Sequence, residues 1–230
     1  MPRRPDDRVI VLVERLGAPG LVRARTIRPS PLTSASAEPS MSAPPRIQII
    51  IGSIRDGRAG EPVARWFADL AARREDLATE LIDLREWNLP FLTTASPPSR
   101  RYETEVQRRW AAKVAEADGY VLVTAEYNHG YPPPLKNALD HVYAEWNRKP
   151  VAYVSYGGPG GGTRAVEQLR GVAVELQQVP VRRQVIIHRP WPNITNGVFA
   201  GEPYERQAAG LLDELAWWAE VLRAGRSRGT

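Results

Sequence analysis

The chain has 230 residues, 43% of them apolar, which suits one sizeable globular domain. It contains no cysteine, which excludes disulfides, cysteine-zinc sites, iron–sulfur clusters and thiolate nucleophiles. The formal net charge is +5, but residues 1–40 alone hold seven arginines against four acidic residues, so most of the excess charge lies in this segment. The rest of the chain has no basic stripe with interleaved aromatic residues. We therefore expect no nucleic-acid partner.

Residues 1–45 are rich in proline and serine, and their one short apolar run, VIVLV at 9–13, is a candidate strand. This composition favours an unstructured extension, and Met41, just ahead of the next apolar run, is a candidate for the true start of the protein. The N-terminus lacks a basic stretch followed by an apolar signal core, and no run reaches the roughly 20 apolar residues that span a bilayer. We therefore expect a cytoplasmic protein without a membrane partner.

From residue 46 to 225, apolar runs alternate with helical periodicity. The expected strands are IQIII (47–51), TELIDL (79–84), GYVLVTA (119–125), PVAYVSY (150–156) and RQVIIH (183–188). Apolar residues recur at helical spacing within 63–71, 106–117, 135–143, 166–176 and 211–222. Continuous apolar strands interleaved with helices are typical of a parallel sheet buried on both faces. We predict one α/β domain with three layers, α/β/α, around a five-stranded parallel sheet.

The loop GSIRDGRAG (52–60) follows the first of these strands and precedes a helix that we expect to begin near Glu61. A glycine-rich turn into a helix presents free backbone N–H groups and a partial positive charge, which favour an anion. Ser53 adds a hydroxyl, and Arg55 and Arg58 add guanidinium groups. Because the loop lacks Gly-Lys-Ser/Thr and Gly-x-Gly-x-x-Gly, a single phosphate fits better than a triphosphate or a dinucleotide. The alternative is a plain glycine turn with solvated arginines.

Two more unusual loops follow the third and fourth strands. AEYNHGYPPPLKNALD (125–140) contains three consecutive prolines, and YGGPGGGTRA (156–165) places five glycines in seven positions. Glycine at this density allows the backbone to approach a flat surface closely. Each loop alone is also compatible with a purely structural turn. Together, at neighbouring strand ends, the three loops predict a ligand with a phosphate tail and a planar head.

The motifs GSIRDGRAG, AEYNHGYPPPLKNALD and GGPGGGTRA resemble, in order and spacing, those of the NADPH-dependent FMN reductase family, over roughly residues 46–190. The resemblance implies a flavodoxin-like fold with strand order 2-1-3-4-5, bound FMN, and NADPH or NADH as hydride donor. It also implies a quinone, flavin, azo or similar small acceptor, and a homodimer or homotetramer. This chain has Arg58 and Gly60 where the family commonly has a serine and an asparagine.

The resemblance also implies which residues would contact FMN. The phosphate loop would include Ser53, Arg55, Arg58, Gly60 and Val63. The isoalloxazine ring would be bordered, mainly through backbone groups, by Glu126, Tyr127, Asn128, His129 and Gly130. Its other flank would be covered by Gly157, Gly158, Gly161 and Gly162.

Without cysteine or metal-ligand spacing, redox chemistry would have to come from the flavin. We expect hydride transfer from NAD(P)H, followed by delivery of two electrons to the acceptor. His129 is a candidate proton donor, although a turn residue or subunit contact is the more ordinary role. Two other functions stay open: a flavodoxin-type electron carrier, which the near-neutral charge of residues 41–230 disfavours, and a binding module for another phosphorylated ligand.

Overall fold

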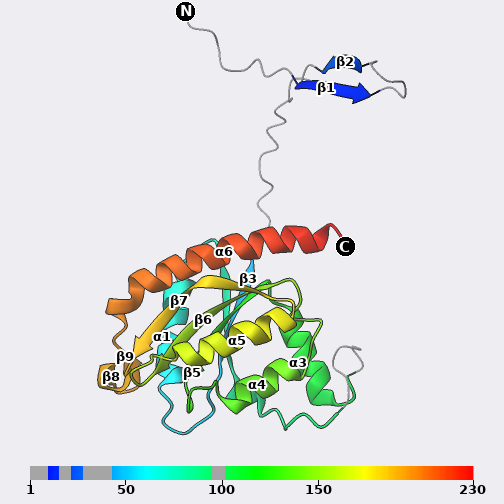
Figure 1. Cartoon of the computed structure of the whole chain (residues 1–230). Helices are drawn as coiled ribbons and strands as arrows, with labels where there is room; N and C mark the ends of the chain where they lie inside the picture. The colour runs from blue at the N-terminus through cyan, green and yellow to red at the C-terminus, as the bar shows by residue number, and fades with distance from the viewer. Residues whose placement is uncertain (1–9, 16–21, 28–42, 95–101, 230) are drawn as a thin grey trace, which may run out of the picture. The chain divides into compact units, whose positions relative to one another are not determined.

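The computed structural model describes residues 10–15, 22–27, 43–94 and 102–229, and it divides the chain into two units, Met1–Ser42 and Ala43–Thr230 (Figure 1). In the first unit, β1 (Ile10–Arg15) pairs antiparallel with β2 (Val22–Ile27). The candidate strand at 9–13 overlaps β1. Most of the other residues in 1–45, where we expect no regular structure, lie outside the described ranges. Met41, the candidate start, also lies outside them. Both expectations stay predictions.

The second unit is built on a five-stranded parallel sheet in the order β4-β3-β5-β6-β7. The strands are β3 (Arg46–Ile51), β4 (Ala78–Asp83), β5 (Gly119–Ala125), β6 (Pro150–Gly157) and β7 (Val179–His188). Counted within this sheet, the order is 2-1-3-4-5, which confirms the predicted fold. Every residue of β5 and β6 is buried, as expected for strands covered on both faces.

Helices cover both faces of the sheet, giving the three predicted layers (Figure 1). On one face, α1 (Gly60–Ala72) and α6 (Glu205–Ser227) form one apolar core with the sheet. On the other, α3 (Glu105–Ala115), α4 (Pro133–Asp140) and α5 (Thr163–Glu175) form a second core. Within the described ranges, no helix has the length and apolar character needed to cross a membrane.

The sequence pattern missed several short elements. The short helix α2 (Leu84–Trp87) follows β4 directly. The strand β7 begins four residues before the expected RQVIIH run, because Pro180 and the exposed Arg182 and Arg183 interrupt the apolar pattern there. After β7 come η2 (Trp191–Asn193) and the hairpin of β8 (Ile194–Thr195) and β9 (Val198–Phe199). The two hairpin strands are too short for a periodic signal. The unit closes through η3 (Glu202–Tyr204) into α6.

We predict that Lys149, buried just before β6, makes stability rise with pH. Its Nζ donates to the carbonyls of Val114 (3.1 Å) and Ala115 (3.2 Å) and to the Tyr120 hydroxyl (3.1 Å), and burial lowers the pKa of Lys149 to about 8. An unfolded lysine has a pKa of about 10.4, so between these values the unfolded chain holds a proton that the native chain has released. Raising the pH from 7 to 9.5 should therefore add about 1–2 kcal/mol of stability through this group.

The measurement is urea unfolding of the wild type and of Lys149→Met at several pH values. The difference in unfolding free energy between the two proteins should change across this window in favour of the wild type. Parallel pH profiles for the two proteins would contradict the prediction.

Candidate functional site

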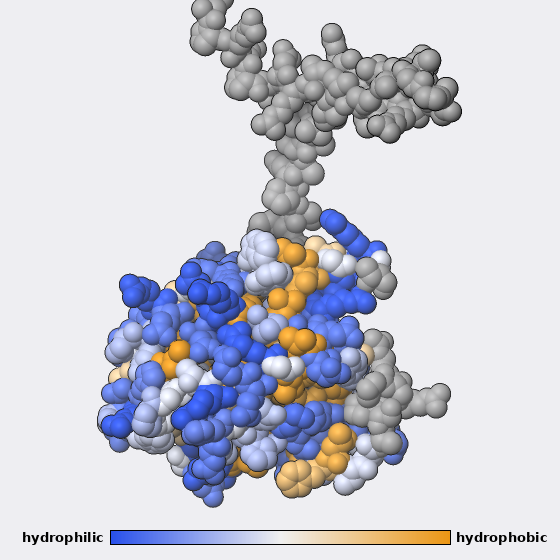
Figure 2. Space-filling model, viewed as in Figure 1, coloured by the Kyte–Doolittle hydropathy of each residue, from blue (hydrophilic) through white to orange (hydrophobic). Residues whose placement is uncertain are grey.

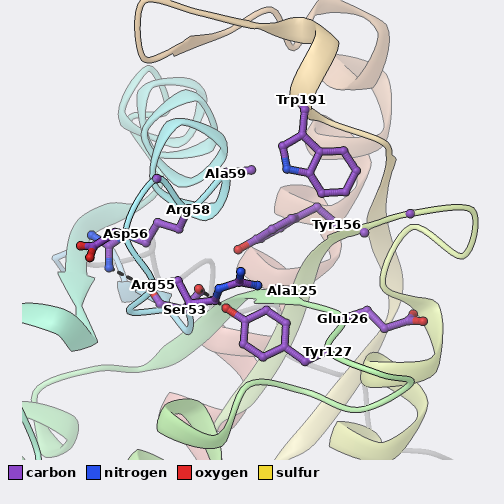
Figure 3. Close-up of a pocket in the computed structure, with 13 residues that line it drawn as sticks. Ser53, Arg55, Asp56, Arg58, Ala59, Ala125, Glu126, Tyr127, Tyr156 and Trp191 are labelled. Atoms are coloured by element: carbon purple, nitrogen blue, oxygen red, sulfur yellow. Dashed lines mark hydrogen bonds between the residues drawn. The ribbon is translucent and has the colours of Figure 1, made fainter.

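A cavity of about 250 Å³ lies where the loops after β3, β5 and β6 meet (Figure 3). Parallel strands end at the same edge of a sheet, so residues far apart in sequence come together here. The wall is formed by Ser53, Arg55, Asp56, Gly57, Arg58, Ala59, Ala125, Glu126, Tyr127, Tyr156, Gly157, Gly158 and Trp191. The three loops singled out in the sequence therefore form one site.

The loop after β3 presents a hydroxyl and a guanidinium to the cavity. Ser53 is buried, and its Oγ lies 2.5 Å from the Tyr127 hydroxyl, which joins this loop to the loop after β5. The Arg55 guanidinium lies over the Tyr127 ring, 5.4 Å from its centroid, and the side chain is exposed (Figure 3). A positive φ of 63° at Gly57 turns the chain before α1, a conformation that glycine adopts without strain.

Arg58 holds this loop in place instead of projecting freely toward a ligand. Only 4% of its side chain is exposed, and it forms a two-pronged ion pair with Asp83 at the end of β4. Its Nη1 also donates to the Ser53 carbonyl (2.7 Å), and its Nη2 donates to Glu61 in the first turn of α1 (3.1 Å). Two carboxylates thus neutralise the Arg58 charge. The sequence pattern alone does not distinguish this arginine from the exposed Arg55.

The loop after β5 contains a tight turn. Tyr127 and Gly130 exchange backbone hydrogen bonds of 2.8 and 3.0 Å around Asn128 and His129, whose φ values of 49° and 71° are typical of a type I′ turn. Asparagine accepts this conformation more readily than most residues. The turn places Tyr127 in the cavity wall and carries the side chain of His129 away from it.

Contacts with α5 fix this turn. His129 Nε2 accepts a hydrogen bond from Arg164 (2.7 Å), and its carbonyl accepts one from Gln168 (3.0 Å). Arg164 also forms an ion pair with Glu126, whose carboxylate points away from the cavity in Figure 3. Glu126 and His129 therefore help to hold the loop through their side chains, and of the two only Glu126 belongs to the cavity wall.

The glycine-rich loop after β6 serves two purposes. Gly157 and Gly158 line the cavity, and a Cβ at Gly158 would meet no atom within 4 Å. Gly161 and Gly162 have positive φ values of 59° and 87° and face the protein, where a Cβ on Gly162 would lie 2.7 Å from Ser155 Cβ. Gly158 leaves the wall open, and Gly157 allows close packing against Gly162 and Glu126. The second pair allows the chain to turn into α5.

Half of the fourteen expected site residues line the cavity: Ser53, Arg55, Arg58, Glu126, Tyr127, Gly157 and Gly158. The other half lie beside or behind the wall: Gly60, Val63, Asn128, His129, Gly130, Gly161 and Gly162. Val63 belongs to the apolar core, and the Tyr156 hydroxyl occupies the space that a Cβ on Gly60 would need.

Two aromatic residues of the wall were not among the expected site residues. Tyr156 lies between Trp191 and Tyr127 in Figure 3, and burial raises the pKa of its hydroxyl well above its ordinary value, so Tyr156 stays neutral. It directly precedes the glycines of the third motif, which was the available signal. Trp191 follows β7 and is 56% exposed. Its position after a strand that ends at the same sheet edge was a weaker signal.

Residues 45–192 match the family described as NADPH-dependent FMN reductase. The chain belongs to this family. The matched range includes all three loops and ends just after Trp191, so it takes in the complete wall of the cavity. Membership of the NADPH-dependent FMN reductases makes the protein an NAD(P)H-dependent flavin and quinone reductase, and it sets aside the electron carrier and the binding module.

Individual relatives agree with this assignment. An NAD(P)H-dependent FMN reductase of Schizosaccharomyces pombe is 40% identical over 157 residues, which cover 67% of this FMN reductase and 78% of the relative. A 2-hydroxy-1,4-benzoquinone reductase of a Burkholderia species is 29% identical over 189 residues, covering 77% and 98%. The flavoenzyme FerB of Paracoccus denitrificans, an NAD(P)H:(acceptor) oxidoreductase, has the same fold, with a TM-score of 0.61, 22% identity and coverage of 76% and 97%.

We predict that the Arg58–Asp83 pair contributes strongly to the stability of this reductase. Asp83→Asn keeps the hydrogen bond to the Arg85 amide that begins α2, but it leaves the buried Arg58 with only Glu61 as a charged partner. We expect a loss of about 2 kcal/mol, because a buried charge that has lost one of its two carboxylate partners is costly. Asp56→Asn is the matched control, since Asp56 is 92% exposed in its pair with Arg85 and should cost less than about 1 kcal/mol. Chemical denaturation measures both, and equal losses would contradict the prediction.

Proposed function

We propose that this reductase binds FMN in the cavity of Figure 3 and transfers two electrons from NAD(P)H to a quinone, flavin, azo compound or similar small acceptor. The observation that carries the proposal is the meeting of an anion-suited loop and a glycine-lined wall in one cavity. FMN, when bound, would supply the group that accepts and releases the hydride. The chain itself contributes binding, orientation and the exclusion of water.

The residues present fit the two ends of FMN. At one end, the loop after β3 offers backbone N–H groups, the Ser53 hydroxyl and the exposed Arg55 guanidinium, which are donors suited to a phosphate. At the other end, the wall at Gly158 is open, because a Cβ there would meet no atom within 4 Å, and Tyr127 lies between the two ends, in contact with Ser53 and Arg55. This polarity, charged at one end and open to a flat body at the other, supports a planar ligand with one phosphate.

Arg58 enters this proposal as a positioning residue. Its bond to the Ser53 carbonyl and its pairs with Asp83 and Glu61 tie the loop to β4 and α1 at the same time. The loop is therefore shaped before any ligand arrives, which reduces the ordering cost of binding. We assign phosphate recognition to Ser53 and Arg55 and loop geometry to Arg58.

The turn after β5 supports a role for its backbone. The amide groups of Asn128 and His129 have no hydrogen-bond acceptor among the described residues, while the amides of Tyr127 and Gly130 bond to each other's carbonyls. We propose that these two amides donate to the edge of the ring and favour negative charge there, in the manner of an oxyanion hole. His129 holds the turn, and a protonating role for its ring stays a weaker proposal because Arg164 donates to its Nε2.

We also propose a homodimer or larger homo-oligomer. Hydrophobic side chains gather in patches on the face shown in Figure 2, and Val174 on α5 and Trp217 and Val221 on α6 are exposed large apolar residues. Exposed apolar patches often mark interaction surfaces. Light scattering that shows a monomer at micromolar concentration with flavin bound would contradict this assembly.

The central test is spectroscopic. The purified protein loaded with FMN should lose its visible flavin absorbance on anaerobic addition of NADPH and regain it when a quinone is added, because the two half-reactions share one ring. Protein that does not take up FMN, or whose bound flavin is not reduced by either nicotinamide, would contradict the proposed function.

We predict that Arg55→Gln weakens FMN binding by about tenfold, since it removes one charge-assisted hydrogen bond to the phosphate. Arg73→Gln is the matched control, because Arg73 is also exposed but lies at the far end of α1, outside the cavity. Quenching of FMN fluorescence measures both affinities. Riboflavin, which lacks the phosphate, should bind the wild type and Arg55→Gln equally. An equal loss for riboflavin would show that Arg55 does not act on the phosphate.

A further inference from the structure

A second cavity, of about 460 Å³, adjoins the first. It is lined by Gly57, Arg58, Ala59, Glu61, Pro62, Arg65, Arg85, Trp191, Ile194 and Gly197. Four of these residues, namely Gly57, Arg58, Ala59 and Trp191, also line the first cavity. The two cavities therefore meet at the turn before α1 and at the indole of Trp191. The second cavity extends over the start of α1 toward the β8–β9 hairpin.

Two exposed arginines give the second cavity its ligand chemistry. Arg65 uses Nε and Nη2 on Glu61 Oε1, at 3.2 and 2.9 Å, and Arg85 uses Nη2 on Asp56, at 2.5 Å. The remaining Nη1 groups of both arginines have no acceptor among the described residues. These surface pairs are worth little in themselves, so an anionic ligand can compete for both guanidinium groups.

The wall also contains Arg58 and Glu61, which pair with each other, and the rest of it is apolar and partly aromatic. Trp191 is 56% exposed, and Pro62 and Ile194 add aliphatic surface. An exposed indole offers a flat face on which a heterocyclic base can stack, and arginines nearby suit the phosphates attached to such a base. The second cavity therefore combines the features that a phosphorylated nucleoside requires.

NAD(P)H, the proposed hydride donor, is a ligand with these features. NAD(P)H consists of two nucleosides joined by a pyrophosphate, and its nicotinamide must enter the flavin cavity, so its other half has to lie on an adjoining surface. Arg164, which also lies near the first cavity, is occupied by Glu126 and His129. Arg65 and Arg85 are more exposed and have free donor groups within the described residues.

We propose that the second cavity binds the phosphorylated adenosine half of NAD(P)H, with Arg65 and Arg85 on its phosphates and Trp191 beside its base. This inference rests on the proposed function, because it assigns the flavin to the first cavity. The proposal also explains why Trp191 lines both cavities. A residue at their junction would contact NAD(P)H where the nicotinamide extends from the second cavity toward the flavin.

The direct test is calorimetric titration of the FMN-loaded protein with NADP⁺. The double variant Arg65→Gln/Arg85→Gln should raise the Kd for NADP⁺ by about tenfold or more, and each single variant by about threefold. Arg108→Gln is the matched control, because Arg108 is also an exposed helical arginine paired with a nearby glutamate, Glu105, and lies outside both cavities. An unchanged Kd in the double variant, or a wild type that does not bind NADP⁺, would overturn the proposal.

Kinetics supply a second readout. The double variant should raise KM for NADPH by a similar factor and leave the rate with an N-alkyl dihydronicotinamide, which has no phosphate, unchanged. A larger effect for NADPH than for NADH would place the arginines at the 2′-phosphate, and equal effects would place them at the pyrophosphate. A matching loss of FMN affinity would instead show that the arginines belong to the flavin phosphate site, and would overturn the proposal. Wild type that neither donor reduces would contradict the proposed function, while the NADP⁺ titration would still decide the subsite.

Discussion

The site depends on the complete burial of β5 and β6 at the centre of the sheet. Strands buried on both faces cannot shift register without exposing apolar side chains or burying polar ones, so their ends are fixed relative to each other. Ala125 is therefore held opposite Tyr156, and the backbone amide of Glu126, just beyond β5, donates to the Tyr156 carbonyl (3.1 Å). The loops can adopt irregular conformations because the strand ends to which they are attached are fixed in register.

A polar network transmits this rigidity to the loops. The loop after β3 is joined to β4 through Arg58 and Asp83 and to the loop after β5 through Ser53 and Tyr127. The turn at 127–130 is in turn joined to α5 through Arg164. Each link connects an irregular segment to a regular element. A cavity built in this way keeps its shape without a ligand, which is the condition for a cofactor site that orients its guest.

The sequence was sufficient to predict the fold and the sheet edge at which the first cavity lies. Long apolar runs identified all five strands of the main sheet, and three unusual loops marked the edge where they end. Side-chain roles were less predictable. Arg55 and Arg58 are three residues apart and chemically identical in the sequence, yet one is exposed and the other is neutralised by Asp83, a residue 25 positions from Arg58. Only the pairing of β3 with β4 brings that carboxylate into reach.

The glycine-rich motifs show the same limit. All four glycines at 157–162 that we expected to cover the ring look equivalent in the sequence, but only Gly157 and Gly158 line the cavity. Positions 161 and 162 require glycine because their φ values are positive and because a Cβ there would collide with Ile186 or Ser155. Glycine marks a close approach of the backbone without saying whether the neighbour is a ligand or the protein itself.

The arginines around the two cavities differ in the groups that neutralise their charge and in their exposure to solvent. Arg58 has two carboxylates and little exposure, so its charge is already compensated and its role is geometric. Arg55 faces an aromatic ring and pairs with no acid among the described residues, so its charge is free for the phosphate of the proposed function. Arg65 and Arg85 are paired with acids but remain open to solvent, which makes their partners easy to exchange. A single basic surface would bind any anion, whereas in the proposed arrangement graded compensation would allow one loop to hold the FMN phosphate beside a subsite that releases its nucleotide after every turnover.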